Sequence, residues 1–145
     1  MVIPFTDREI ERAWRENWSA CCKTPRTNAH RLLLFYAVEC GLKAVLMRRQ
    51  EINRSDLCSE ISDCQHNINK LLDCLTAGEE WKLPADLKMK PIKGKSRKND
   101  ERKFTPGEVN QMWRYGGCCE NITDQDLEKK LLEIVKWIEG ELRRP

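Results

Sequence analysis

The chain has 145 residues, which is enough for one domain with a sizeable hydrophobic core. Its 26 basic and 23 acidic side chains nearly cancel, so the net charge of +3 does not by itself indicate a nucleic-acid-binding protein. The charged N-terminal sequence MVIPFTDREIERAW lacks the apolar stretch of a secretory signal, and we expect a cytoplasmic protein without membrane contact.

The first predicted helix covers residues 6–22. Thr6 and Glu9 form a capping box at its start, and apolar side chains then recur at helical spacing. Two of these, Trp14 and Trp18, fall on one stripe, so we expect them in the core or in an interface. The sequence Thr-Pro-Arg at residues 24–26 ends this helix.

The central predicted helix covers residues 28–49, with Asn28 as its cap. It is apolar on nearly every face, which indicates a helix enclosed by other helices. Glu39 interrupts the apolar run, which is too short to span a bilayer. Glu39 and Lys43 have the spacing of a helical ion pair. Either they neutralise each other beside the core, or they form the polar floor of a binding cleft.

Residues 55–75 also have helical periodicity, with an apolar face that ends at Leu75. If this helix is continuous, His66 lies on its opposite face as an exposed polar residue. A break near Asp63 would instead place His66 in the first turn of a new helix.

Residues 84–104 contain eight basic and three acidic residues and show no apolar period, which predicts a mobile basic loop. This loop is either a solvated insertion or a contact for phosphate groups. The candidate nucleic-acid-binding residues are Lys93, Lys95, Arg97 and Lys98. Because no aromatic residues are interleaved with them, we expect base-specific contacts there to be weak.

Thr105 and Glu108 form another capping box, which starts a short helix that continues to about Trp113. The sequence WRYGG at residues 113–117 then presents polar side chains before a sharp turn. Thr123 caps the last helix, residues 124–142. With no strand pattern recognised, the expected fold is all-α: a single domain, residues 1–145, built as an up-and-down bundle of four main helices plus a short helix.

The eight cysteines form no C-x-x-C pair, and the chain has only two histidines, so no zinc site is expected. In a reducing compartment we expect the cysteines to be unpaired, small core residues. No cofactor is predicted either.

Three segments carry a resemblance to a known family: YAVECGLKAVLMRR in the central helix, HNINKLL from residue 66, and WRYGG before the last helix. In this order they resemble the HEPN superfamily (higher eukaryotes and prokaryotes nucleotide-binding). The chain is similar to small prokaryotic members, many of them linked with toxin–antitoxin or phage-defence systems. The resemblance implies a HEPN-like helical fold, RNA or a nucleotide as ligand, a homodimer, and a protein partner such as an antitoxin or nucleotidyltransferase.

Active HEPN proteins cut RNA without metal, using an Arg and a His that are separated by four to six residues. Here no His follows Arg114, and Arg26 and His30 have only three residues between them. The resemblance makes His66 and Arg114 the candidate catalytic residues, as acid–base group and phosphate electrophile. The candidate ligand-binding residues are Glu39, Lys43, Asn67, Lys70 and Tyr115.

Three hypotheses remain open. The chain could be a non-catalytic module that binds RNA, a nucleotide or a protein. It could be a metal-independent endoribonuclease that uses His66 or His30 together with Arg114. It could also be a structural assembly subunit with Trp14 and Trp18 in its interface. Arg114 in turn is either a ligand contact or a strut paired with an acid such as Glu39.

Overall fold

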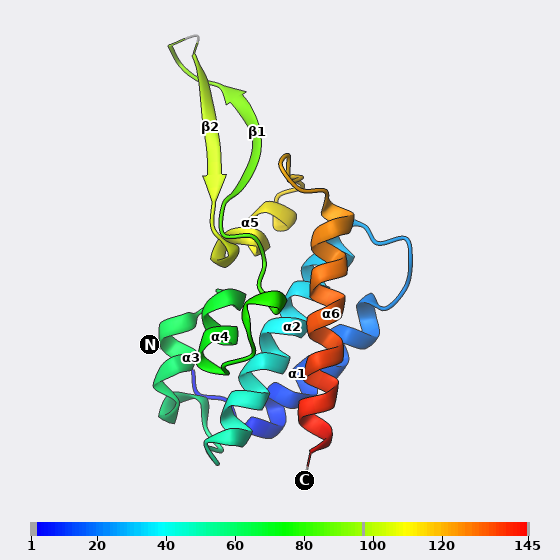
Figure 1. Cartoon of the computed structure of the whole chain (residues 1–145), viewed down its shortest axis with the longest axis vertical. Coiled ribbons are helices and arrows are strands. Elements are labelled where there is room, and N and C mark those ends of the chain that lie inside the picture. The colour runs from blue at the N-terminus through cyan, green and yellow to red at the C-terminus, as the bar shows by residue number, and fades with distance from the viewer. Residues whose placement is uncertain (1–2, 97, 145) are drawn as a thin grey trace.

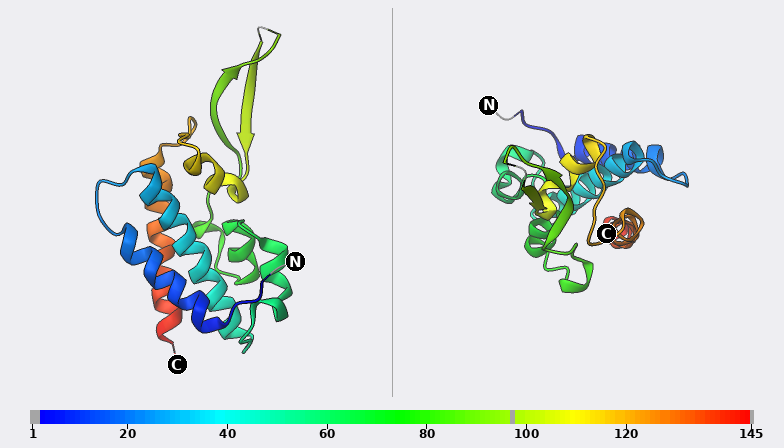
Figure 2. Two further views of the ribbon diagram at one scale, coloured as in Figure 1. Left: turned by 180° about the vertical axis from the view of Figure 1, so that it is seen from behind. Right: turned by 90° about the horizontal axis from the view of Figure 1, so that it is seen from above.

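The computed structural model describes residues 3–96 and 98–144 (Figure 1). A helical body carries a β-hairpin that projects from one end along the long axis of the molecule. The view from behind shows the same arrangement, and the view from above looks along the hairpin onto the helical body (Figure 2). The described elements are α1 (Asp7–Cys21), α2 (Asn28–Arg49), α3 (Ser59–Cys64), α4 (Ile68–Cys74), β1 (Leu87–Lys93), β2 (Asn99–Phe104), α5 (Val109–Arg114) and α6 (Asp124–Arg143), with three short 3₁₀ helices between them.

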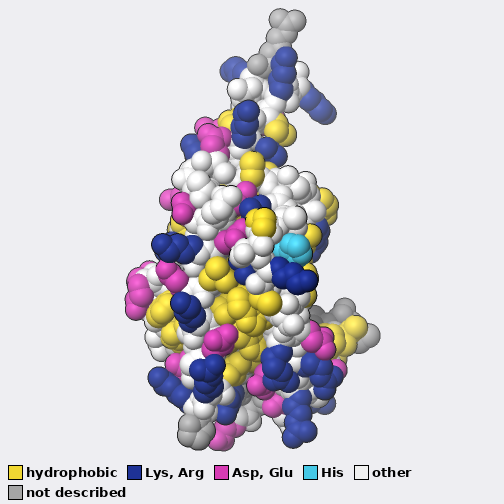
Figure 3. All heavy atoms as spheres, turned by 90° about the vertical axis from the view of Figure 1, so that its right-hand side faces the viewer, with side chains coloured by type: hydrophobic (Ala, Val, Ile, Leu, Met, Phe, Trp, Pro, Cys, Tyr) yellow, Lys and Arg dark blue, Asp and Glu magenta, His cyan; other side chains and the backbone are white. Residues whose placement is uncertain are grey.

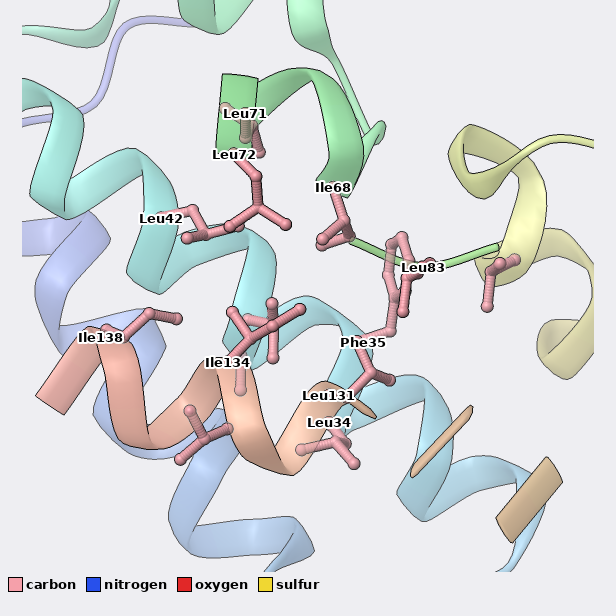
Figure 4. Packing of buried hydrophobic residues seen from close by; sticks show 14 of the residues in the cluster. Leu34, Phe35, Leu42, Ile68, Leu71, Leu72, Leu83, Leu131, Ile134 and Ile138 are labelled. Atoms are coloured by element: carbon pink, nitrogen blue, oxygen red, sulfur yellow. The ribbon is translucent and has the colours of Figure 1, made fainter. Parts of the chain in front are cut away.

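The central helix α2 is confirmed, and α1, α4, α5 and α6 all contact it. Its buried side chains come from every face of the helix. Figure 4 shows Leu34, Phe35 and Leu42 of α2 meeting buried side chains of α4 and α6. The predicted cap was wrong by one residue: the Thr27 side chain accepts the hydrogen bond from the backbone N–H of His30, and His30 completes the capping box.

Gly41 explains how α1 and α6 both approach α2 so closely. A Cβ atom built at this position would lie 2.8 Å from Ile138 of α6 and 2.9 Å from Trp14 of α1. Any larger residue would therefore displace the side chain of Ile138 or Trp14. Trp14 is buried, and Trp18 is half-buried beside α6, so the first tryptophan belongs to the core.

The second predicted helix is divided into α3 and α4. Gln65 has a φ of 49°, a left-handed conformation that ends α3, and the side chain of Asn67 then caps α4. The helix is thus broken close to Asp63, as one alternative predicted, but the prediction that His66 would lie in the first turn of the new helix was wrong. His66 lies in the connection, immediately before the cap.

The expectation of an all-α bundle was wrong, because residues 84–104 hold an antiparallel hairpin instead of a mobile loop. Leu87 pairs with Phe104 and Met89 with Arg102, and the register is interrupted between Met89 and Ile92. Pro91, which has no N–H to donate, lies in that interruption. Most strand residues are exposed, so the apolar alternation is confined to the base of the hairpin and was too short to recognise.

The last helix and its Thr123 cap are confirmed, as is the capping box of Thr105 and Glu108. The short predicted helix begins with a 3₁₀ turn, Pro106–Glu108, and continues as α5. Among the described helices, none combines the length and the apolar character needed to cross a membrane.

Substitution of Leu42 by alanine tests the enclosure of α2. Its side chain is 0% exposed, so the substitution leaves a cavity in the centre of the core. We expect the free energy of unfolding to fall by about 2–5 kcal/mol in chemical denaturation. Leu57→Ala, at a leucine that is 63% exposed, is the control and should stay near wild type. Equal stability of the two variants would contradict this description of the core.

Candidate functional site

Glu39 and Lys43 of α2 form a polar cluster with His66, which lies in the connection between α3 and α4. One carboxylate oxygen of Glu39 accepts a hydrogen bond from Lys43 Nζ at 2.8 Å, and the other lies 2.8 Å from Nδ1 of His66. The Glu39 side chain is only 8% exposed, whereas that of His66 is 52% exposed. The ion pair that the spacing predicted is present, and His66 is a second partner of Glu39.

The cluster borders a cleft of about 560 Å³ between the N-terminal segment, α1, α2 and the start of α3. Phe5, Ile10 and Ile61 give it apolar walls, while Glu39 and Lys43 lie at its α2 side. The two alternatives for this ion pair are therefore compatible, because Glu39 and Lys43 neutralise each other and both also line a cleft. Cys40 lines the cleft too, but burial raises the pKa of its thiol to about 11, so Cys40 is not a ready nucleophile.

The connection between α3 and α4 positions His66. The left-handed Gln65 turns the chain, and Asn67 Oδ1 accepts the hydrogen bond from the backbone N–H of Lys70. Asn67 and Lys70, predicted as ligand-binding residues, thus form the N-terminal cap of α4. The Lys70 side chain is exposed. Their structural role accounts for the HNINKLL pattern without a ligand.

Arg114, the last residue of α5, is exposed and donates a hydrogen bond from Nη2 to the hydroxyl of Tyr36. This hydrogen bond raises the pKa of Arg114 above its ordinary value. Glu39 binds Lys43 and His66, so the suggested Arg114–Glu39 strut is wrong. Tyr115 follows as the C-terminal cap of α5 and is 80% exposed.

Tyr36, which the sequence analysis did not single out, contacts Arg114 and lies on α2 close to Glu39, the partner of His66. It precedes Glu39 by three residues on α2, so the two side chains are neighbours on one face of the helix. Arg114 contacts the first and His66 the second. The structure therefore brings both to one edge of α2, on consecutive turns.

Asn110 is a second residue that the sequence analysis missed. It lies one helical turn before Arg114 on α5, and its side chain is 3% exposed overall. Its Oδ1 is buried and has no hydrogen-bond partner within residues 3–96 and 98–144. A buried amide oxygen without a hydrogen-bond partner lowers the stability of the fold. Asn110 therefore differs from an ordinary core residue, and it lies close in sequence to Arg114.

Arg26 precedes α2 and His30 lies in its first turn, and both have structural contacts. His30 belongs to the helix cap, and Arg26 donates from Nε to the carbonyl of Cys21 at 2.7 Å. Arg26 Nη1 also lies 3.6 Å from the carboxylate of Glu128 on α6. This near-match to the HEPN motif is thus explained by capping and by an ion pair.

The basic segment is the second candidate region, and Figure 3 shows its Lys and Arg side chains around the projecting hairpin. Lys93, Lys95 and Lys98 are exposed, while Arg97 lies outside the described residues. Residues 84–104 hold eight basic and three acidic residues, a surplus of five. Since the whole chain has a net charge of +3, the remainder of the chain carries a net charge of −2.

Alanine substitutions at Glu39 and Arg114 test whether the buried ion pair contributes more to stability than the exposed hydrogen bond does. Glu39→Ala removes the partner of the partly buried Lys43, and we expect a loss of about 3 kcal/mol in the free energy of unfolding. The double variant Glu39→Ala, Lys43→Met should recover much of that loss because no unpaired charge remains. Arg114→Ala should leave the melting temperature near wild type. Equal losses for the two single alanine variants would contradict this assignment.

The chain matches no protein-family model, no curated protein and no solved structure. The resemblance to HEPN proteins therefore remains an expectation that rests on the three segments that carry it.

Proposed function

We propose that this protein is a HEPN-like RNA-binding protein whose β1–β2 hairpin contacts the phosphate backbone. The observation that carries the proposal is the charge distribution: the positive surplus belongs to the hairpin segment, and the remainder of the chain is slightly negative. A cationic arm on a weakly acidic body attracts a polyanion to one place and in one orientation.

The geometry of the arm supports this proposal. The hairpin stands clear of the helices, so a polyanion can approach it from several sides (Figures 1 and 3). Lys93, Lys95 and Lys98 are exposed near its tip. At its base the backbone is fastened to the body, where the N–H of Glu120 donates to the carbonyl of Lys88 at 2.8 Å. An anchored arm loses less conformational entropy on binding than a mobile loop does.

Reversal of the three tip lysines tests the proposal. The variant Lys93→Glu, Lys95→Glu, Lys98→Glu should bind a labelled single-stranded RNA much more weakly, while its melting temperature stays near wild type. Wild-type affinity should fall steeply between about 50 and 200 mM salt, and the variant should show a smaller salt dependence because fewer counterions are released. Fluorescence anisotropy across this salt series measures both effects.

The matched control reverses three exposed lysines on the body, Lys23, Lys129 and Lys136, which changes the net charge by the same amount. This variant should keep most of the RNA affinity. If the two triple variants lose affinity equally, only net charge matters and the hairpin is not the binding element.

Metal-independent RNA cleavage is the second candidate function, and the contact between His66 and Glu39 favours it. With Nδ1 on the carboxylate, the other ring nitrogen of a half-exposed imidazole is left to exchange protons with a ligand. Arg114, on the next turn of the same edge, can stabilise a phosphorane. A ribose 2′-hydroxyl would then lose its proton and attack the adjacent phosphate, and the bond from phosphorus to the 5′-oxygen of the next nucleotide would break. The products would be a 2′,3′-cyclic phosphate end and a protonated 5′-hydroxyl end.

Incubation of RNA with the protein in EDTA tests this second function. Wild type should generate cyclic phosphate ends, and His66→Ala and Arg114→Ala should each abolish them without loss of folding. His30→Ala, at the cap of α2, provides the matched control and should cleave like wild type. Cleavage that persists in His66→Ala, or that requires a divalent metal, would exclude this mechanism.

A further inference from the structure

A groove of about 700 Å³ lies between the base of the hairpin and the turn after α5. Its hairpin side carries Met89 and Phe104 together with the cations Lys90, Arg102 and Lys103. Its α5 side carries Gln111, Met112 and Tyr115. Neither the polar cluster on α2 nor the lysines at the hairpin tip take part in it.

The floor of the groove is apolar and closely packed. A Cβ atom at Gly117 would lie 2.2 Å from the terminal methyl of Met89 and 3.2 Å from Cγ of Met112. The glycine thus allows the two methionine side chains to lie against the backbone. Methionine sulfur and methyl groups pack well against flat aromatic surfaces.

Backbone contacts hold this floor in place. Met89 forms a β-bridge with Cys119. The side-chain amide of Asn121 accepts a hydrogen bond from the backbone N–H of Lys88 and donates one to the carbonyl of Asp86. Across the hairpin, Arg102 Nε donates to the carbonyl of Lys90 at 2.9 Å. The groove is therefore formed before any ligand arrives, which lowers the cost of binding.

Tyr115 is the most unusual member of the groove, because a large aromatic side chain is left 80% exposed at its rim. The next residue, Gly116, has a φ of 75°, a conformation that favours glycine and that turns the chain away just after the tyrosine. An exposed aromatic ring beside lysines is typical of surfaces on which nucleobases stack.

From this arrangement we infer that the groove binds a nucleobase of single-stranded RNA, with Tyr115 as the stacking platform. The inference rests on the proposed RNA binding and adds the form of RNA that is recognised. The base would cover the apolar floor, its flanking phosphates would contact Lys90 and Lys103, and the Gln111 amide could reach the base edge. A duplex keeps its bases stacked and paired and cannot fill such a groove.

The experiment uses a short oligouridine that carries one 2-aminopurine, whose fluorescence is quenched when the base stacks. Wild-type protein should quench it and should bind the single strand more tightly than a duplex of the same length. Tyr115→Ala should lose the quenching and weaken single-strand binding by about 10-fold. Tyr115→Phe, which keeps the ring, should restore both.

Glycine substitutions give a second variant pair with a different physical basis. Gly117→Ala should push the Met89 methyl into the groove and reduce quenching, although no charge is changed. Gly140→Ala on α6 is the matched control, because a Cβ there meets nothing within 4 Å, and it should quench like wild type. Circular dichroism confirms that both variants are folded.

The outcomes separate this inference from the proposed function. If Tyr115→Ala binds and quenches like wild type while the hairpin-tip variant is weakened, the base site is rejected and RNA binding stands, which leaves the groove to a protein partner. If single strand and duplex bind equally well to wild type, the base site is also rejected. If wild type binds neither form, both proposals fail.

Discussion

Because α2 is apolar around its whole circumference, water has to be excluded from all of its faces, and the other elements are placed accordingly. Helices α1, α4, α5 and α6 each cover part of it. Gly41 allows two of them to approach on one side. Enclosure also limits where polar side chains can occur. Glu39 is tolerated in this helix because Lys43 and His66 each contact one of its carboxylate oxygens.

Much of the helical body could be predicted, because its signals are local. Capping boxes at Thr6 and Thr105, the Thr123 cap and the apolar stripe of α6 depend on residues only a few positions apart. The hairpin could not be recognised in this way. Its strands are held by backbone pairing and by anchors at its base, and charged side chains cover most of their surface, so no alternating apolar pattern extends along them.

The contacts of the candidate site are likewise of two kinds, local ones that could be predicted and tertiary ones that could not. The Glu39–Lys43 pair follows from helical spacing, and its presence was expected. The contacts of Glu39 with His66 and of Tyr36 with Arg114 join residues 27 and 78 positions apart, so only the tertiary fold can reveal them. Tyr115 illustrates the same point, because the turn after α5 supplies its exposed ring to the groove at the base of the hairpin.

The exposed hairpin has a consequence for association between copies of the chain. Within the described residues β1 and β2 form a sheet of two strands, so each strand has an outer edge, and that of β1 is already occupied at its base by the bridge of Met89 to Cys119. Such edges invite strand addition, and lysines along them are a common defence because like charges repel. We therefore expect the lysines near the tip of this hairpin to oppose such pairing, in addition to their proposed contact with phosphate. A polyanion that neutralises these lysines would remove this protection and make edge-to-edge pairing easier. Binding of several copies of the chain to one polyanion would therefore favour their association with one another.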